Sequence, residues 1–495
     1  MTHYRLALWI LLLALLASCS TPTPVSTPTS LPTETAVPPT STPVPTATAT
    51  SIPVPARAQY TMNVVLDYAA KSVAVDETIV YPNHSGHVLT DLMLAVEPNL
   101  WPNCFTLKSL DLNGTAVTNY TLDGQKLSFA LPEVFQPEMT ATIKLSYNII
   151  LPEIEPTNPN LTRPRIFGFS PNQINLTNWY PFVVPNISGQ WVLHDPWYYG
   201  EHLAYDAADF NVKLKFADST HIPVVASSGE LEGTDTDGVE TYILASGRAF
   251  IFSISPNYQV ANTKVGNVTL YSYYFPSFDK PGKLSLMTSA QALQIYSQRY
   301  GPYPHKTLSV IMGDFPDGME FSASYFTSFG YYNLYAGNPD NSVFKLSVIY
   351  LAAHETAHQW WFEQVADDQA LQPWLDEAMA TYSEHIFFET YYPDQLSLWW
   401  YVRSDQYQPQ GWVDTPIYSG GGFRTYTNAV YFRGAHFLDD LRKRMGDQAF
   451  FAFLQDYLVK ENGKIAASAD FFHILSQHTT TDYSDLVRQY FQNSY

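Results

Sequence analysis

The sequence predicts a multidomain α+β protein in which an N-terminal β-sandwich-like domain is followed by a mainly helical domain. Two observations carry this prediction. From about residue 59 to residue 275, short runs of alternating polar and apolar residues are separated by turn residues, which is typical of strands. From about residue 276 onward, apolar residues recur with helical spacing. Residues 59–495 are too many for one usual hydrophobic core, so we expect two domains.

The first nineteen residues have the composition of an export signal. Arg5 precedes an apolar run over residues 6–17, and the segment ends in Leu-Ala-Ser-Cys at Cys19. About a dozen apolar residues are too few to cross a bilayer but suit the core of a signal peptide. The ending resembles a bacterial lipobox, which implies a signal peptide over residues 1–19 with a lipidated Cys19. A plain secretory signal with a chance cysteine is the alternative.

Residues 20–58 predict a disordered tether. Up to Pro55 they are almost wholly Pro, Thr, Ser, Ala and Val, with Glu34 as the only charge. Such a segment cannot bury enough apolar surface to fold, and proline-rich chain stays extended. We therefore expect an extracytoplasmic globular protein held at a bacterial membrane by a lipid anchor, on the cell surface or the periplasmic side.

The predicted β domain covers residues 59–275 and begins with the alternating runs 60–68 and 72–81. The second domain, residues 276–495, opens with a helix over residues 284–300 that Gly301-Pro302 stops, followed by a strand over residues 307–312. Further helices are predicted after a glycine-rich loop at residues 419–422, over residues 435–445, 448–460, 469–478 and 483–491.

A metal-binding pattern lies in this second domain. If residues from about 346 to 363 form a helix, His354 and His358 lie one turn apart on one face and can reach the same ion. Glu377 follows in a segment that reads as the start of another helix. Two histidines and one carboxylate are the ligands of thermolysin-like catalytic zinc sites, so we expect one Zn²⁺ per chain.

Glu355 stands between the two histidines and is a candidate base. Beside the metal but not bound to it, it would take a proton from water and return it to the leaving amine. A chance match to the His-Glu-x-x-His pattern on an ordinary buried helix is the alternative, and the acidic segment around Glu377 argues against it.

Four segments in order resemble peptidase family M1, the zinc metallopeptidase group of aminopeptidase N and leukotriene A4 hydrolase. They are the Asp-Gly-Met-Glu-Phe string 317–321, the histidine motif, the Trp-Leu-Asp-Glu-Ala string 374–378 and the Tyr-Phe-Arg-Gly-Ala string 431–435. Residues 66–99 resemble the opening of that family's first β domain. The resemblance runs from about residue 60 to the C-terminus and implies a thermolysin-like catalytic domain over residues 276–495.

The resemblance also implies roles for single residues. Glu320 would hold the free α-amino group of a peptide, and its neighbours Gly318 and Met319 would line the substrate. Tyr431 would donate a hydrogen bond to the oxyanion, where a placed donor lowers the barrier by about 3 kcal/mol. Glu320 also follows a strand-like run, so we expect it on an edge strand that can pair with substrate.

Glu384 lies seven residues after Glu377 and thus on the same helical face. Since imidazoles that bind metals usually donate their second N–H to a carboxylate, Glu384 is a candidate partner for a ligand histidine, with a solvent-facing role as the alternative. The family's Ala-Arg-Arg-x-Phe-Pro segment, whose residue grips the amine a second time, is absent, and Asn178-Trp179-Tyr180-Pro181 stands near its place.

The net charge limits the possible binding partners, and the cysteine content limits the possible disulfides. The formal net charge of −20 argues against nucleic-acid binding. The chain has two cysteines, so lipidation of Cys19 would leave Cys104 as a free, buried small residue. The prediction is a zinc aminopeptidase acting on peptides with a free N-terminus. A broader zinc metallopeptidase or endopeptidase, or a non-catalytic β-rich binding lipoprotein, are the alternatives.

Overall fold

The computed structural model describes residues 57–154 and 166–495 of the chain. The predicted signal peptide 1–19, its Cys19 and nearly all of the predicted tether 20–58 lie outside these residues. Residues from Pro55 onward form one unit. Within the described ranges, no helix is both long and apolar enough to span a membrane.

The first strands bury every second side chain, as their alternating sequence predicts. In β1 (Ala58–Asp67) the buried residues are Tyr60, Met62, Val64 and Leu66. Successive side chains of a strand point to opposite faces, so this spacing gives one apolar face. β1 pairs antiparallel with β2 (Ser72–Pro82) and parallel with β14 (Ala208–Phe216).

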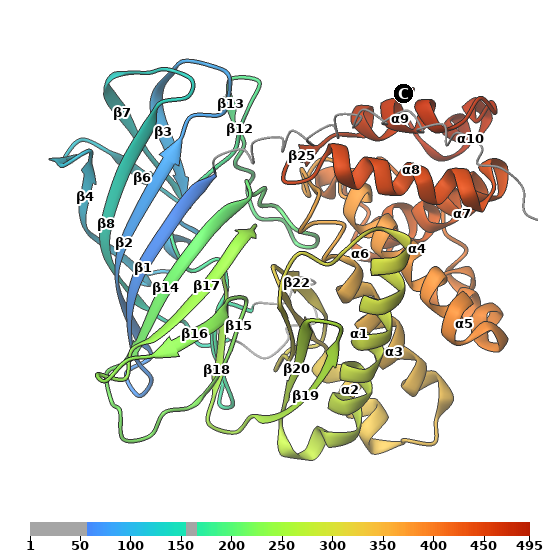
Figure 1. Ribbon diagram of the computed structural model, residues 1–495, viewed down its shortest axis with the longest axis horizontal. Helices are drawn as coiled ribbons and strands as arrows, with labels where there is room; N and C mark the ends of the chain where they lie inside the picture. The colour runs from blue at the N-terminus through green and yellow to red at the C-terminus, as the bar shows by residue number, and fades with distance from the viewer. Residues whose placement is uncertain (1–56, 155–165) are drawn as a thin grey trace, which may run out of the picture. The chain divides into compact units, whose positions relative to one another are not determined.

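The N-terminal part is a layered β structure, coloured blue to green in Figure 1. Its largest sheet has the strand order β16 (Glu230–Thr234), β17 (Glu240–Gly247), β14, β1, β2, β8 (Thr140–Ile150), β4 (Phe105–Leu112) and β5 (Thr115–Ala116). A four-stranded sheet has the order β15 (Val224–Ser227), β18 (Phe252–Ser255), β10 (Ile174–Leu176) and β9 (Gly168–Phe169). A second has the order β11 (Phe182–Val183), β3 (Leu89–Ala95), β7 (Lys126–Phe135) and β6 (Thr121–Asp123), and β12 (Asn186–Ile187) pairs with β13 (Gln190–Trp191). The β-sandwich-like prediction is therefore confirmed.

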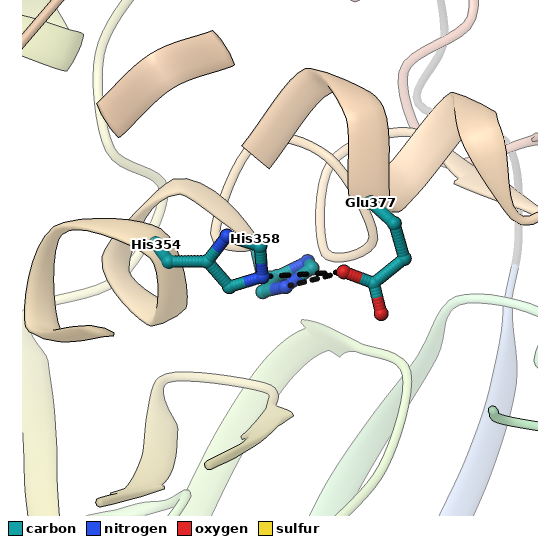
Figure 2. A group of neighbouring side chains, drawn as sticks. All are labelled: His354, His358 and Glu377. Carbon is teal, nitrogen blue, oxygen red and sulfur yellow. Dashed lines mark hydrogen bonds and ion pairs between the residues drawn. The ribbon is translucent and has the colours of Figure 1, made fainter. Parts of the chain in front are cut away.

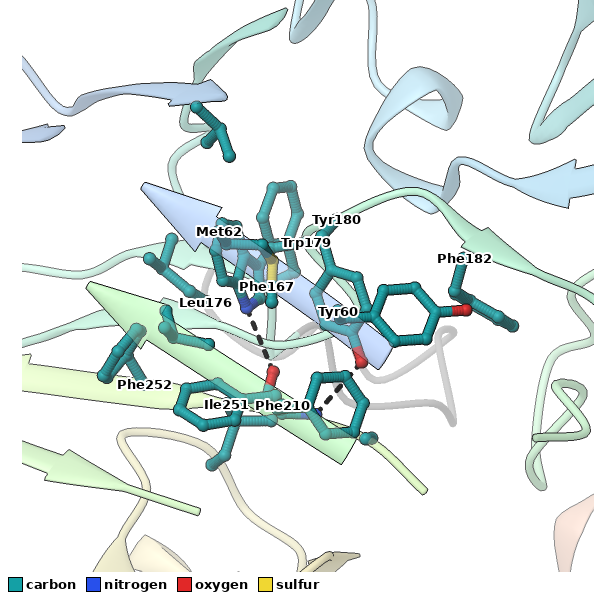
Figure 3. Packing of buried hydrophobic residues seen from close by; sticks show 14 of the residues in the cluster. Tyr60, Met62, Phe167, Leu176, Trp179, Tyr180, Phe182, Phe210, Ile251 and Phe252 are labelled. Carbon is teal, nitrogen blue, oxygen red and sulfur yellow. Dashed lines mark hydrogen bonds between the residues drawn. The ribbon is translucent and has the colours of Figure 1, made fainter. Parts of the chain in front are cut away.

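Large aromatic side chains fill the space between these sheets, as Figure 3 shows. Trp179 and Tyr180 are both buried there, and their polar ends bond to one backbone unit. The indole Nε1 of Trp179 donates to the carbonyl of Phe250 over 3.0 Å, and the Tyr180 hydroxyl accepts from the Phe250 amide over 3.2 Å. The Trp-Tyr pair that stands near the place of the missing amine-gripping segment thus belongs to the β core.

The second, mainly helical part of the protein begins earlier than the predicted residue 276. A five-stranded sheet has the order β19 (Gln259–Val265), β20 (Val268–Tyr274), β21 (Thr307–Met312), β23 (Ser324–Thr327) and β22 (Met319–Phe321). β20 runs parallel to β21, so the hairpin of β19 and β20 belongs to the same sheet as the strand predicted at residues 307–312. A domain boundary at residue 275 would divide this sheet. Alternation alone cannot show which sheet a hairpin joins, because both sheets bury one face.

Helices pack against this sheet and form most of the rest of the chain, coloured yellow to red in Figure 1. They are α1 (Asp279–Arg299), α2 (Phe329–Gly337), α3 (Ser342–Ala357), α4 (Trp374–Tyr391), α5 (Leu396–Arg403), α6 (Phe423–Thr427), α7 (Gly434–Met445), α8 (Asp447–Lys460), α9 (Ser468–His478) and α10 (Ser484–Tyr490). A short parallel pair joins β24 (Ala366–Asp367) to β25 (Ile465–Ala466). The α+β class is confirmed, and the helical part contains more strand than predicted.

The helix with the histidine pair differs from the prediction at both ends. α3 starts at Ser342, where the Asn341 side chain accepts hydrogen bonds from Val343 N and Phe344 N, and it ends at Ala357 instead of residue 363. His358 is the capping residue, and the chain then turns, with the Glu363 amide donating to the His358 carbonyl over 3.0 Å. The apolar residues after His358 are buried in that turn, so their hydrophobicity resembles a continued helix.

One buried arginine links the β part to the helical part. The guanidinium of Arg248 donates to the carbonyls of Tyr205 at 3.0 Å, Glu363 at 3.1 Å and Lys464 at 2.9 Å. Its planar fork of donors suits several backbone acceptors at once. These bonds fix the segment after α3, and hence the helix with the histidine pair, relative to the β sheets.

Candidate active site and metal centre

His354 and His358 lie at the C-terminal end of α3 with their rings nearly perpendicular, at an interplanar angle of 82°. The ring centroids are 4.7 Å apart, and both side chains are buried. His354 is in the last helical turn and His358 caps the helix, so the one-turn spacing holds although the helix stops between them. Two imidazole edges therefore converge on one point.

Glu377 reaches that point from the first turn of α4, as Figure 2 shows. Its Oε2 lies 3.2 Å from His354 Nε2 and 3.7 Å from His358 Nε2. The N-terminal turn of a helix favours carboxylates, because the peptide dipoles place partial positive charge there. α4 thus presents an acid to the histidine pair.

The three donors fit a zinc ion. The ligand atoms of His354, His358 and Glu377 all lie within 4.8 Å of one another. Zinc is bound by histidine nitrogen and carboxylate oxygen at about 2.0–2.2 Å, so tetrahedral neighbours stand about 3.3 Å apart. The two measured separations from Glu377 bracket that value. Three protein ligands leave the fourth position for water or substrate, as in catalytic zinc sites.

His354 is oriented by the candidate partner Glu384. Its Nδ1 lies 2.9 Å from Glu384 Oε1, so the ring's other nitrogen, Nε2, faces the metal position. Glu384 also accepts from Trp399 Nε1 over 2.9 Å and from Arg403 Nη2 over 2.8 Å. Fully buried and fully bonded, this carboxylate holds the ring in place.

His358 is oriented by an acid that sequence reasoning did not single out. Its Nδ1 contacts Asp376 Oδ1 and lies 3.1 Å from the carbonyl of Trp361. The other oxygen of Asp376 accepts from Gln369 Nε2 over 2.9 Å. Both ligand histidines therefore carry the carboxylate contact that fixes the tautomer and raises ligand basicity.

The protonation tendencies of this cluster also favour a bound cation. Burial lowers the pKa of His354, but hydrogen bonds to Glu377 and Glu384 outweigh it and raise the pKa to about 9. Burial would raise the pKa of Glu377, but the hydrogen bond from His354 and the nearby His358 lower it. The buried carboxylates thus stabilise positive charge between them, and a divalent cation can replace the proton.

Glu355 faces the same site and binds none of the three ligand residues. Burial raises its pKa well above the usual range, and its Oε2 has no hydrogen-bond partner within the described residues. Gly318 makes room for it, since a Cβ there would lie 2.2 Å from Glu355 Oε1. The space at Gly318 is therefore used by a side chain of the protein itself.

Glu320 lies in β22, the edge strand of the five-stranded sheet, as predicted. Its Oε1 accepts from Gln369 Nε2 over 2.9 Å, and ligand atoms of Glu320, Glu355 and His358 lie within 4.8 Å of one another. Burial is the main cause that raises its pKa to about 7. An edge strand beside a buried acid suits an extended peptide with a terminal ammonium.

Tyr431 lies in a π-helical segment, Asn428–Arg433, directly before α7. Its hydroxyl donates to Glu377 Oε1 over 2.5 Å, and its ring stacks on His354 at 6.0 Å. Gly434 allows this approach, because a Cβ there would lie 2.3 Å from the Cβ of Ala378. π-Helical turns occur often at functional sites, where they redirect a side chain.

The predicted site residues meet in one cavity of about 300 Å³. Its lining includes Gly318, Met319, Glu320, His354, Glu355, His358, Glu377 and Tyr431. Glu384 lies behind His354 and does not line it. Cys19 lies outside the described residues, and Cys104 is free and buried.

Sequence reasoning missed Asp376, Gln369 and Arg403. Asp376 directly precedes Glu377 in the sequence. An acid next to a candidate ligand is a signal that could have marked Asp376 as part of the site. Gln369 and Arg403 carry no such signal, because the turn after α3 and helix α5 bring them to the site.

Two histidines and a carboxylate around a metal position, with a further glutamate beside them, are the arrangement found in thermolysin-like zinc metallopeptidases. Residues 284–490 match the model of the Peptidase family M1 domain. This part of the chain therefore resembles an M1 peptidase domain.

Curated relatives agree with this family. Aminopeptidase M1-C of Oryza sativa subsp. japonica is 24% identical over 217 residues, 42% of this chain and 25% of that protein. Endoplasmic reticulum aminopeptidase 1 of Homo sapiens is 22% identical over 290 residues, 56% of this chain and 31% of that protein. The chain thus spans about a quarter to a third of the length of these relatives.

Solved structures share the fold over most of both chains. An M1 zinc metallopeptidase from Deinococcus radiodurans has a TM-score of 0.63 at 18% identity, covering 89% of this chain and 94% of that one. A mutant of it bound to a Tyr-Ser-Ala substrate has a TM-score of 0.63 at 19% identity, covering 87% and 93%. The arrangement of a β part and a helical part is therefore that of M1 metallopeptidases.

Proposed function

We propose that this protein is a zinc-dependent aminopeptidase that removes N-terminal residues from peptides. The observation that carries the proposal is the position of Glu320. It lies on an edge strand, in the same cavity as the candidate metal ligands and with its carboxylate within 4.8 Å of Glu355 and His358 ligand atoms. A terminal ammonium held there puts the first peptide bond next to the metal position.

His354, His358 and Glu377 would hold the zinc, which, when bound, supplies Lewis-acid activation of water and of the scissile carbonyl. Glu355 takes the proton from the attacking water and passes it to the leaving amine. Its unpartnered Oε2 is available for that proton. The Tyr431 hydroxyl, beside Glu377, donates to the carbonyl oxygen as negative charge develops on it.

The names of the relatives support the same reaction. The curated relatives are aminopeptidases, and the structural neighbour was crystallised with the tripeptide Tyr-Ser-Ala. A site that compensates buried carboxylates with a peptide ammonium explains why an acid, and not a neutral side chain, stands at position 320.

The free amine requirement can be measured directly. The wild-type protein should cleave a peptide with a free N-terminus at least about tenfold more efficiently, in kcat/KM, than its N-acetylated form. Loss of a hydrogen bond to a charged group costs about 1.5–3 kcal/mol, and the buried acid would also stay uncompensated. Glu320→Gln should reduce this preference, and Glu138→Gln, at a side chain that is 76% exposed, should keep it.

Two outcomes would overturn the proposal in different ways. Equal cleavage of free and acetylated peptides, or cleavage of blocked peptides at internal bonds, would identify a broader metallopeptidase or endopeptidase. No cleavage of any peptide by zinc-loaded protein would support a non-catalytic binding protein.

We also propose that the protein acts outside the cytoplasm as a lipoprotein anchored at Cys19. The apolar run before the Leu-Ala-Ser-Cys string and the proline-rich segment after it support this. In a bacterial host, the full chain should incorporate labelled fatty acid and fractionate with membranes, while Cys19→Ser should do neither. Membrane association of Cys19→Ser equal to that of the wild type would contradict the anchor.

A further inference from the structure

A second and larger cavity adjoins the metal site. It has a volume of about 420 Å³ and lies between the β part and the catalytic part. It shares Glu201, Met319 and Glu320 with the cavity that holds the metal ligands. The two cavities therefore meet at the acid assigned to the substrate ammonium.

The larger cavity has mainly apolar walls, and aromatic rings are the most numerous apolar side chains in them. Among the described residues, seven Trp, Tyr and Phe rings line it, from Trp101, Phe167, Trp197, Tyr198, Tyr205, Phe321 and Phe362. Trp101 and Phe167 are 5.1 Å apart between ring centroids, and so are Trp197 and Tyr198. Apolar concave sites with a few polar groups at one end are typical of side-chain recognition.

We infer that this cavity receives the side chain of the substrate's N-terminal residue and selects large aromatic side chains. The inference rests on the proposed aminopeptidase function. The Cα that carries the ammonium also carries the scissile carbonyl and the side chain. With the ammonium at Glu320 and the carbonyl at the metal position, the side chain points into the remaining space beside Glu320, which is the larger cavity.

The chemistry of the walls determines the preference. Transfer of a large apolar side chain from water contributes in proportion to the area buried, and aromatic side chains bury about 150–250 Å² each. Rings on the walls add edge-to-face and stacked contacts that alanine or leucine cannot make. The substrate class is therefore peptides with Phe, Tyr or Trp at the N-terminus.

A panel of tripeptides that differ in the first residue tests this preference. The wild-type protein should cleave the Phe and Trp peptides with kcat/KM at least about 30-fold above the Ala peptide, since even one methylene in an apolar pocket changes kcat/KM by about 10–200-fold. Free L-Phe and L-Trp should also inhibit more strongly than free L-Ala.

The Trp101→Ala variant removes one wall of the larger cavity and leaves the metal cavity unchanged, because Trp101 lines only the larger of the two cavities. The Phe-to-Ala ratio should fall about tenfold, with cleavage of the Ala peptide unchanged. The matched control is Trp412→Ala, at a side chain that is 43% exposed and outside both cavities, and it should keep the ratio.

The inference and the proposed function fail separately. If cleavage needs the free amine but Ala or Arg peptides are cleaved as well as Phe peptides, the aromatic cavity is not the side-chain pocket. If the free amine has no effect, the aminopeptidase proposal itself falls. Should Trp101→Ala fail to fold, the wild-type panel and the inhibition by free amino acids still decide the preference.

Discussion

The Glu355→Gln variant is expected to lose about 10²- to 10⁴-fold in kcat for peptide cleavage while it keeps one zinc ion per chain. General-base catalysis contributes rate factors of this size. Glu355 lines the metal cavity and has an oxygen without a hydrogen-bond partner within the described residues. Glutamine has the same shape and cannot accept the proton of water. Steady-state kinetics and elemental analysis on the same preparation measure both effects.

The zinc content of the Glu355→Gln variant is the control that distinguishes a general base from a metal ligand. Glu355 is not one of the three residues that surround the metal position, so its replacement should leave the metal in place. Glu138→Gln, a change at an exposed glutamate of the β part, should alter neither quantity. An unchanged kcat would show that Glu355 takes no part in proton transfer. A joint loss of zinc and activity would show that Glu355 binds the metal.

The Tyr431→Phe variant is expected to lower kcat by about 10²- to 10³-fold with little change in KM. Removal of one hydrogen-bond donor from a developing oxyanion has costs of this size, because the charge appears only in the transition state. The hydroxyl lies within the metal cavity, 2.5 Å from Glu377 Oε1. Kinetics with one aromatic peptide measure kcat and KM together.

A structural role for the same hydroxyl predicts a different result. If its main task is to orient Glu377, Tyr431→Phe should weaken zinc binding, which competition with a chelator would detect. Unchanged zinc affinity together with a lower kcat supports the oxyanion role. Tyr401→Phe, at a side chain that is 58% exposed on α5, is the matched control and should change neither.

Much of the fold follows from local sequence patterns. Alternation predicts β1 and β2, and the strand at residues 307–312 has the predicted bounds. The helices near the C-terminus lie within a residue or two of their predicted ends, because their apolar spacing and flanking residues act locally. The predicted boundary at residue 275 places β19 and β20 in the β domain, whereas β20 pairs with β21 of the second sheet. This pairing is a long-range contact that alternation does not encode.

The site divides in the same way. The spacing of His354 and His358 on one helix, and of Glu377 and Glu384 on another, is local geometry that the sequence states directly. The contacts of Asp376 with His358, and of Gln369 with both Glu320 and Asp376, arise from the turn between those helices. Arg403 reaches Glu384 from a third helix. Such contacts depend on how separate elements pack.

The sequence by itself indicated the candidate ligand set, the candidate base and the family resemblance, because each depends on residues within one or two helical turns of each other or within short motifs. Only the tertiary structure decided where the substrate's first side chain goes. The aromatic cavity combines Trp101 and Trp197 of the β part with Phe321 and Phe362 of the catalytic part, and none of these residues is near another in the chain. Packing of distant segments brings them together, and no local pattern specifies that packing.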